Sequence, residues 1–209
     1  MSGKNGIFQP DNPFFSILTR VFDLLMLNIL CLICSLPIVT AGAACIALYT
    51  VIFKWMRGDD PPVVSTYFEA FRGNLKQGCA MGAVFLVLFL ILGADLHITG
   101  HTESSMGSVM YGVTLMLLAA GVALFAYAFP LAAWFENTVR GHLGNAWRLA
   151  VTHLPQTLIL TVLHILPIVW FLLSPETFFT GAFLWGIIGG SVTAYFCAWF
   201  LTAIFQKLQ

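Results

Sequence analysis

Long runs of apolar residues separated by short polar segments make up most of this chain. A helix rises about 1.5 Å per residue, so about 20 apolar residues cross the hydrocarbon core of a bilayer. The runs predict six spans in a single membrane domain, 1–209, at about residues 21–36, 43–56, 79–96, 109–135, 156–173 and 181–205. The pattern therefore predicts an all-α fold, a polytopic membrane helix bundle.

Two of the polar segments carry apolar side chains at helical spacing on one face. The segments are 65–77 and 141–154, and each lies between an inward-running and an outward-running span. Such a pattern is typical of an amphipathic helix, so we predict two of them at the cytoplasmic surface. Their aromatic and basic side chains are candidates for docking a partner. These candidates are Phe71 and Arg72 in the first segment and Trp147 and Arg148 in the second.

The composition agrees with a membrane protein. Charged residues are 9% of the chain, hydrophobic residues 59%, and the mean hydropathy is +0.91, whereas soluble domains are about 25% charged. Nine basic and nine acidic residues cannot cover the surface of a soluble globule of this size. The balance excludes a nucleic-acid binder, a disordered regulator and a secreted disulfide scaffold.

The distribution of basic residues predicts the orientation. With the N-terminus in the cytoplasm and six spans, every Lys and Arg falls on the cytoplasmic side, and the outer loops 97–108 and 174–180 contain none. This agrees with the positive-inside rule. We therefore predict a multi-pass protein with both termini in the cytoplasm. The basic residues are Lys4, Arg20, Lys54, Arg57, Arg72, Lys76, Arg140, Arg148 and Lys207.

A few polar residues lie inside the predicted spans. Asn28, Cys31 and Ser35 share one face of the first span, and His164 lies in the middle of the fifth. Asn28, Ser35 and His164 are candidate intramembrane polar sites, because polar groups at this depth are costly. They have two interpretations, the lining of a polar path or hydrogen bonds between helices. We favour hydrogen bonds, and for His164 we expect a partner on another helix.

Small residues recur every fourth position in the sixth span. Gly186, Gly190 and Ala194 are the centre of this stripe, and Gly78 and Gly82 repeat the spacing at the start of the third span. Small residues let two helix backbones approach closely. Such stripes usually pack helices within one bundle, and the alternative is dimerisation or docking to another membrane protein.

Polar residues at the outer end of the third span are of metal-ligating types. They are Asp95, His97, His101 and Glu103, and their spacing matches no known zinc signature. We interpret them as an outer loop in contact with water. No nucleophile–base pair and no phosphate loop is visible. We therefore predict no metal, no cofactor and no catalytic residue, and we favour a protein that is not an enzyme.

Two pairs of opposite charges have helical spacing. Arg20 and Asp23 are three residues apart at the start of the first span. Glu136 and Arg140 are four apart at the inner end of the fourth span. We interpret both as interfacial ion pairs, each worth a few tenths of a kcal/mol.

A set of residues spread over most of the chain matches a known family of membrane proteins. The matching residues are Phe8, Asn12 to Phe15, Arg20, Asp23, Leu24, Leu27, Asn28, Cys34 to Thr40, Gly42, Ala47 to Tyr49, Arg57, Gly58, Ala70 to Arg72, Lys76, Gln77, His153 to Pro155 and Thr157. By these residues the chain resembles the YesL family of bacterial membrane proteins. The resemblance implies a multi-span protein of the bacterial cell membrane, about 200 residues long, with no assigned activity. It also implies an encoding near genes for carbohydrate uptake, including sugar ABC importers.

Three functional hypotheses follow, all for a protein in contact with the lipid bilayer. The first is an accessory or interaction partner of a carbohydrate ABC import system, bound to its permease or ATPase. The second is a small transporter or channel for a sugar or ion, acting alone or as a homodimer. The third is a structural or assembly role without a ligand, which the sequence does not separate from the first. Charge gathered at one surface favours docking over conduction.

Overall fold

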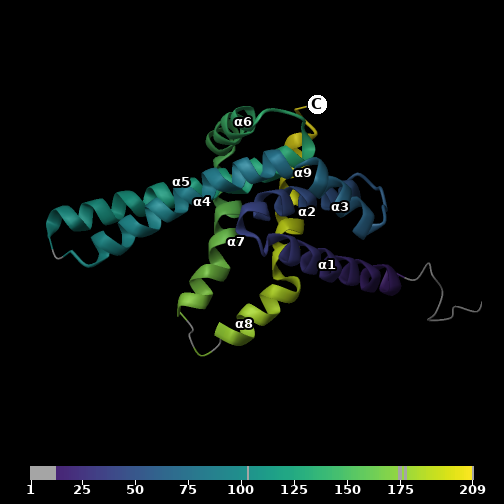
Figure 1. Ribbon diagram of the computed structural model, residues 1–209, viewed down its shortest axis with the longest axis horizontal. Helices are drawn as coiled ribbons and strands as arrows, with labels where there is room; N and C mark the ends of the chain where they lie inside the picture. Colours follow the sequence, from purple (N-terminus) through teal and green to yellow (C-terminus); the bar gives the residue numbers. More distant parts are fainter. Residues whose placement is uncertain (1–12, 103, 174–175, 177, 209) are drawn as a thin grey trace, which may run out of the picture.

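The computed structural model describes residues 13–102, 104–173, 176 and 178–208 (Figure 1). The described residues form helices and no strand, so the predicted all-α polytopic membrane fold is confirmed. The helices are α1 Pro13–Ser35, α2 Ala41–Met56, α3 Val63–Gly73, α4 Leu75–Gly100, α5 Ser105–Trp134, α6 Val139–Thr152, α7 Leu154–Leu173, α8 Phe178–Leu184 and α9 Gly190–Phe205. A short 3-10 turn, Ile38–Thr40, precedes α2, and a π-helix, Trp185–Gly189, joins α8 to α9.

Five helical segments of the described chain are long and apolar enough to cross a membrane. A sixth is reached when α6 and α7 are taken together, although these two helices are bent by 110° at their junction. The segment from α8 through the π-helix to α9 counts as one span. The five segments are Phe15–Ser35, Ile38–Met56, Leu75–Gly100, Ser105–Trp134 and Phe178–Phe205.

The short helix α2 forms the centre of the protein. It packs against α1, α3, α4, α5 and α9, and 61% of its apolar segment is buried, against 17% for α4. Alanine and glycine fill the first turn of α2, and small side chains let neighbouring helices approach it. The second predicted span is therefore the core of the protein.

Glycines bring α2 and α4 into backbone contact. A Cβ on Gly42 would overlap the carbonyl oxygen of Gly78, and a Cβ on Gly78 would overlap the backbone of Ala43. A Cβ on Gly82 would lie 3.3 Å from the backbone nitrogen of Gly42. The small-residue spacing at the start of α4 therefore packs helices within this chain.

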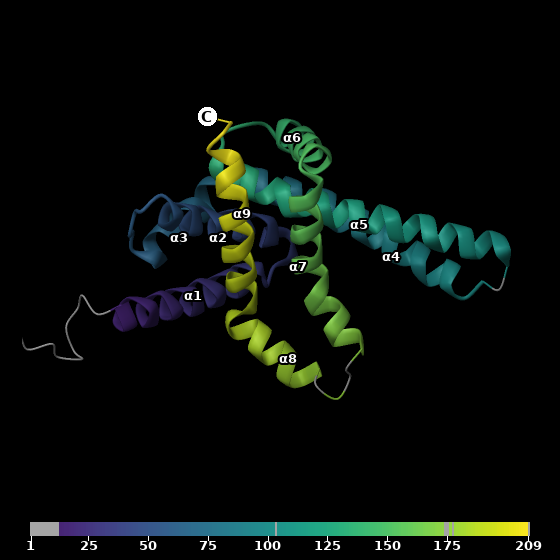
Figure 2. The same ribbon diagram turned by 180° about the vertical axis from the view of Figure 1, so that it is seen from behind.

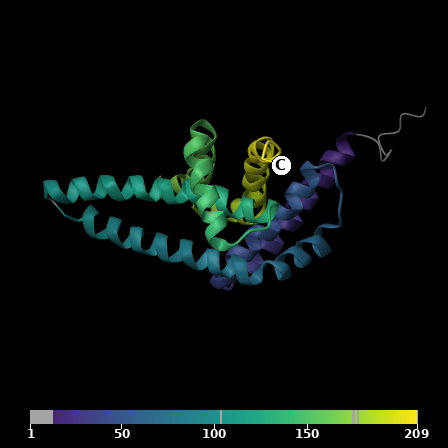
Figure 3. The same cartoon turned by 90° about the horizontal axis from the view of Figure 1, so that it is seen from above.

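The helices point in two main directions. The α4–α5 hairpin extends far to one side of the body, transverse to the vertical α7 and α9 (Figures 1 and 2). Seen from above, the hairpin and the α1–α3 region lie on opposite sides of α7 and α9 (Figure 3). Much of the surface of α4 and α5 consists of exposed large apolar side chains, which suits contact with lipid.

The first amphipathic helix is shorter than predicted. The sequence pattern extends from 65 to 77, but α3 ends at Gly73 and α4 begins at Leu75. The side chain of Asn74 donates a hydrogen bond to the carbonyl oxygen of Ala70 at 2.9 Å and so satisfies the end of α3. Asparagine competes for backbone groups in this way and favours helix ends. The chain therefore turns at Asn74, and the apolar pattern continues on α4.

Candidate functional site

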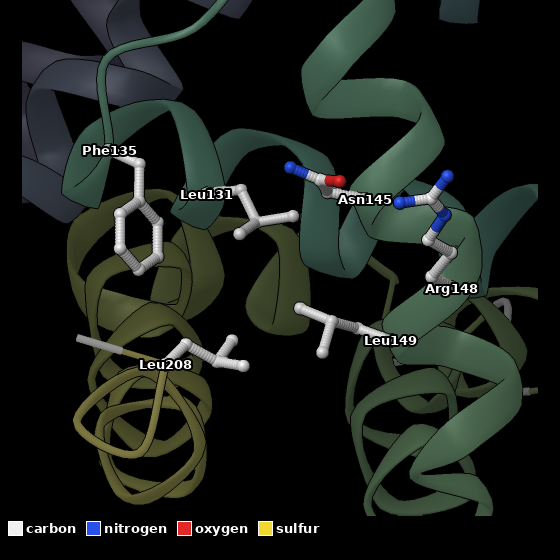
Figure 4. A pocket seen from close by; sticks show the side chains of 6 residues that line it. All are labelled: Leu131, Phe135, Asn145, Arg148, Leu149 and Leu208. Carbon is white, nitrogen blue, oxygen red and sulfur yellow. The ribbon is translucent and has the colours of Figure 1, made fainter.

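A groove opens between α6, the end of α5 and the C-terminal segment after α9 (Figure 4). Its volume is about 310 Å³. Leucine and phenylalanine side chains form most of its walls, and Asn145 and Arg148 provide polar groups from α6. We call it the α6 groove, and its lining residues are Leu131, Phe135, Asn145, Arg148, Leu149 and Leu208.

Helix α6 also exposes apolar and basic side chains outside this groove. The Thr138 hydroxyl caps the helix by accepting the backbone N–H of Gly141 at 3.2 Å. The predicted docking residues Trp147 and Arg148 are both exposed, with Trp147 at 58% and Val151 beside it at 51%. An exposed Trp next to apolar and basic groups is common at binding surfaces.

The docking residues predicted on α3 have a different environment. Phe71 is half-buried and stacks on the fully buried Tyr67, with ring centroids 6.2 Å apart. Arg72 is exposed. Because its ring already packs in the protein, Phe71 offers less surface to a partner than Trp147 does. The two predicted docking helices therefore differ in the aromatic surface that they expose, and α6 exposes more of it than α3.

His142 is the buried polar residue of α6. Its side chain is 1% exposed, and its Nε2 atom has no hydrogen-bond partner among the described residues. Burial lowers the pKa of His142, opposed by a hydrogen bond to the backbone of Asn137. The neutral imidazole is therefore favoured in the folded protein, and His142 anchors α6 to the body without contributing a charge.

Two of the predicted intramembrane polar residues line the same pocket. Asn28 of α1 and His164 of α7 lie in the wall of a cavity of about 290 Å³ together with Cys31, Cys45 and Tyr49. We call it the intramembrane pocket. Ser35 is not among its lining residues, and its hydroxyl lies 4.0 Å from the Cys31 sulfur. The structure therefore brings Asn28 and His164 together and leaves Ser35 outside.

Asn28 connects α1 to the π-helix between α8 and α9. Its side-chain amide donates to the carbonyl oxygen of Gly186, and its Oδ1 atom accepts the backbone N–H of Ser191 at 2.8 Å. The Ser191 hydroxyl donates back to the carbonyl oxygen of Leu24 at 2.8 Å. A π-helix disturbs the regular helical hydrogen bonds. Asn28 satisfies backbone groups at this irregularity, which supports the structural interpretation of this residue.

The small-residue stripe of the last span lies at the same contact between Asn28 of α1 and the last span. A Cβ on Gly190 would lie 2.7 Å from the Asn28 Oδ1 atom. Ala194 is 3% exposed, and Gly186 supplies the carbonyl oxygen that Asn28 binds. The centre of the stripe thus packs within this chain against α1, the first of the two interpretations drawn from the sequence.

His164 is held by its own helix. Its Nδ1 atom lies 2.8 Å from the carbonyl oxygen of Leu160, one turn earlier in α7. The ring of Phe125, on α5, meets the imidazole edge-on with centroids 5.9 Å apart. The expected hydrogen-bond partner on another helix is therefore replaced by a backbone carbonyl one turn away. The imidazole remains part of the pocket wall.

One predicted ion pair is present and the other is wrong. Arg20 lies 3.9 Å from Asp23, and it also reaches Asp60 at 3.3 Å. Glu136 and Arg140 form no ion pair in the described chain. Helix α5 ends at Trp134 and α6 begins at Val139, so these two residues do not share a helix.

In the outer cluster of metal-ligating residue types, one member makes a hydrogen bond that joins two helices. The carboxylate of Asp95 accepts a hydrogen bond from the hydroxyl of Thr114, which joins α4 to α5. The rings of His97 and His101 lie 4.9 Å apart by their centroids. Glu103 lies outside the described residues. Within those residues, no group of three or more acidic, His or Cys side chains is placed to hold a metal.

A third pocket gathers charged side chains that the sequence did not bring together. Its volume is about 360 Å³, and its walls come from the end of α2, from α3, from the end of α5 and from the segment after α5. We call it the charged pocket, and its charged residues are Lys54, Arg57, Glu69 and Glu136. In the sequence, Lys54 and Arg57 served only to predict the orientation of the chain. Their position at the end of the second predicted span is the sequence feature that indicates a site at the membrane surface.

Comparison with known proteins gives relatives without an assigned activity. Residues 24–96 match a family described as "Protein of unknown function, DUF624". The chain is 29% identical over 172 residues to the "Uncharacterized protein YesL" of Bacillus subtilis (strain 168), covering 79% of this chain and 81% of that protein. It is 26% identical over 129 residues to the "Uncharacterized protein YteU" of the same organism, covering 61% of this chain and 57% of that protein.

No solved structure matches the chain. The family match runs from α1 to α4 and therefore includes Asn28, the whole of α2 and the glycines at the α2–α4 contact. The α6 groove and the last span lie beyond it.

Proposed function

We propose that this chain, a YesL-like membrane protein of a family of unknown function, is an interaction protein that docks a partner through α6. The observation that carries the proposal is the α6 groove, an open concave surface lined in part by the exposed Arg148, with the exposed Trp147 on another face of the same helix. Tryptophan and arginine are enriched among the residues that dominate binding energy at protein interfaces. The buried face of α6 fixes this surface on the protein.

We further propose that the partner belongs to a carbohydrate ABC import system. The support is the family resemblance together with the amphipathic character of α6, since ABC permeases bind their ATPases through short cytoplasmic helices. The positive-inside rule would place α6 in the cytoplasm with both chain ends, where an ATPase or permease loop is accessible. A second copy of this chain is the other partner that the test distinguishes.

Changing Trp147 and Arg148 together to alanine is expected to abolish docking without unfolding the protein, because both side chains are exposed. Loss of a central Trp or Arg typically weakens an interface by about 2 kcal/mol or more, about thirtyfold in affinity. The measurement is co-purification of a sugar ABC permease or ATPase with the tagged protein in mild detergent.

The matched control is Trp199→Ala, an exposed tryptophan on α9. It should leave the partner bound. Repeated recovery of the wild-type protein alone would reject the ABC partner, and recovery as a homodimer would assign the groove to self-association.

The intramembrane pocket supports the second hypothesis, a small transporter or channel. Asn28, His164 and Thr193 supply polar groups to a cavity among spans. This hypothesis predicts uptake of a sugar or ion into liposomes containing the protein, and a loss of uptake in His164→Ala. Uptake no faster than in protein-free liposomes would reject it. Intact uptake in His164→Ala would remove His164 from the mechanism.

A further inference from the structure

The charged pocket contains acids and bases that do not neutralise each other. Lys54 and Arg57 lie at the C-terminal end of α2, Glu69 lies on α3, and Glu136 follows α5. Within the described part of the chain, no ion pair includes any of these four residues. Two positive and two negative groups therefore face one concavity, available to a ligand that carries both charges.

The basic side of this pocket has a defined geometry. Gly58 has a φ of +88°, and its backbone N–H closes onto the carbonyl oxygen of Trp55 at 3.0 Å, which ends α2. A left-handed glycine is a common way to end a helix. The Arg57 guanidinium then lies 4.1 Å from the centre of the Trp134 ring, an attractive cation–π contact. Arg57 is thus held in place beside Lys54.

The pocket also has a polar group that is not hydrogen-bonded. The indole N–H of Trp134, a residue of the pocket wall, is buried and has no partner among the described residues. Buried polar groups normally have partners. An oxygen-rich ligand would supply an acceptor for this N–H.

The position of the pocket indicates what the ligand is. The α2 and α5 segments that could cross a membrane end at Met56 and Trp134, and both ends border the pocket. Tryptophan and basic residues at the ends of spans lie at the level of lipid headgroups. The volume of about 360 Å³ is within the range of small-ligand sites, about 300–1,000 Å³.

We propose that the charged pocket binds the headgroup of an aminophospholipid of the phosphatidylethanolamine type. The phosphate would contact Lys54 and Arg57, and the primary ammonium would contact Glu69 and Glu136. A phosphatidylglycerol headgroup leaves both carboxylates without a cation, and a choline headgroup has no N–H to donate. This inference is independent of the α6 groove and of any ABC partner.

Native mass spectrometry of the delipidated full chain in detergent tests the assignment, with dihexanoyl phosphatidylethanolamine, phosphatidylcholine and phosphatidylglycerol as probes. We expect the ethanolamine lipid to bind at least about tenfold more tightly than the other two, equivalent to about 1.4 kcal/mol. Similar affinities for all three lipids would overturn the proposal. Free phosphoethanolamine should bind much more weakly than the lipid, and equal binding would overturn the lipid assignment.

Two double variants identify the pocket as the site of this preference. Glu69→Gln with Glu136→Gln should remove the preference for ethanolamine over choline, whereas Lys54→Gln with Arg57→Gln should weaken all three phospholipids. These side chains are exposed or half-buried, and the apparent melting temperature confirms folding. Glu176→Gln, a matched charge change between α7 and α8, should change nothing. A preference that survives in the Glu69/Glu136 variant would also overturn the proposal.

Discussion

Gly42→Leu is expected to force α2 and α4 apart and to destabilise the folded protein strongly. A Cβ at this position already overlaps the carbonyl oxygen of Gly78 and would lie 3.0 Å from the backbone nitrogen of Gly82. These are backbone atoms, so no side-chain rotation relieves the clash. Because α2 is the central helix, moving it disturbs its contacts with four other helices.

The expected cost is about 3 kcal/mol or more, at the upper end of overpacking effects. For a chain of this size, that corresponds to a fall of about 10 °C in the apparent melting temperature. The measurement is thermal unfolding in detergent, with size-exclusion chromatography for the fraction that stays monodisperse. Gly93→Leu is the matched control, because no atom lies within 4 Å of a Cβ at Gly93 of α4. Equal stability of the two variants would contradict the close α2–α4 contact.

Asn28→Leu is expected to destabilise the protein by about 1–3 kcal/mol, because leucine has a similar volume but no hydrogen-bonding group. The substitution leaves the carbonyl oxygen of Gly186 and the backbone N–H of Ser191 without the amide that binds them. Both groups lie at depth in an apolar span, where water cannot replace that partner. The apparent melting temperature should fall by about 3–10 °C.

Ser35→Ala is the control on the same helix. Among the described residues, the Ser35 hydroxyl has only a 4.0 Å contact with the Cys31 sulfur, so its loss should leave the melting temperature nearly unchanged. An Asn28→Leu variant as stable as Ser35→Ala would show that the contact between α1 and the π-helix contributes little. A stable Asn28→Leu variant without transport activity would instead favour a functional role in the intramembrane pocket.

Local features of the sequence predicted the helices well. The apolar runs correspond to α1, α2, α4, α5, α7 and the segment from α8 to α9, because length and hydropathy are properties of each segment alone. The spacing of Gly78 and Gly82 likewise predicted a close helix contact. The amphipathic pattern of 141–154 corresponds to α6, on which Trp147 and Arg148 are both exposed.

Two predictions from the sequence were wrong because a helix ends where the local sequence pattern continues. The pattern of 65–77 continued smoothly, but the chain turns at Asn74. Glu136 and Arg140 have helical spacing, but the helix ends before Glu136. Helical spacing implies a contact only if one helix includes both residues.

By itself, the sequence determined that this is an all-α membrane protein, where its helices lie along the chain, and which side chains are candidates for docking. Only the tertiary structure decided that α2 is the centre, that Asn28 meets the π-helix, and that four charges from three segments share one pocket. The difference has a physical reason. Hydropathy and helical period act over neighbouring residues, whereas these contacts join residues far apart in the chain and depend on how whole helices pack.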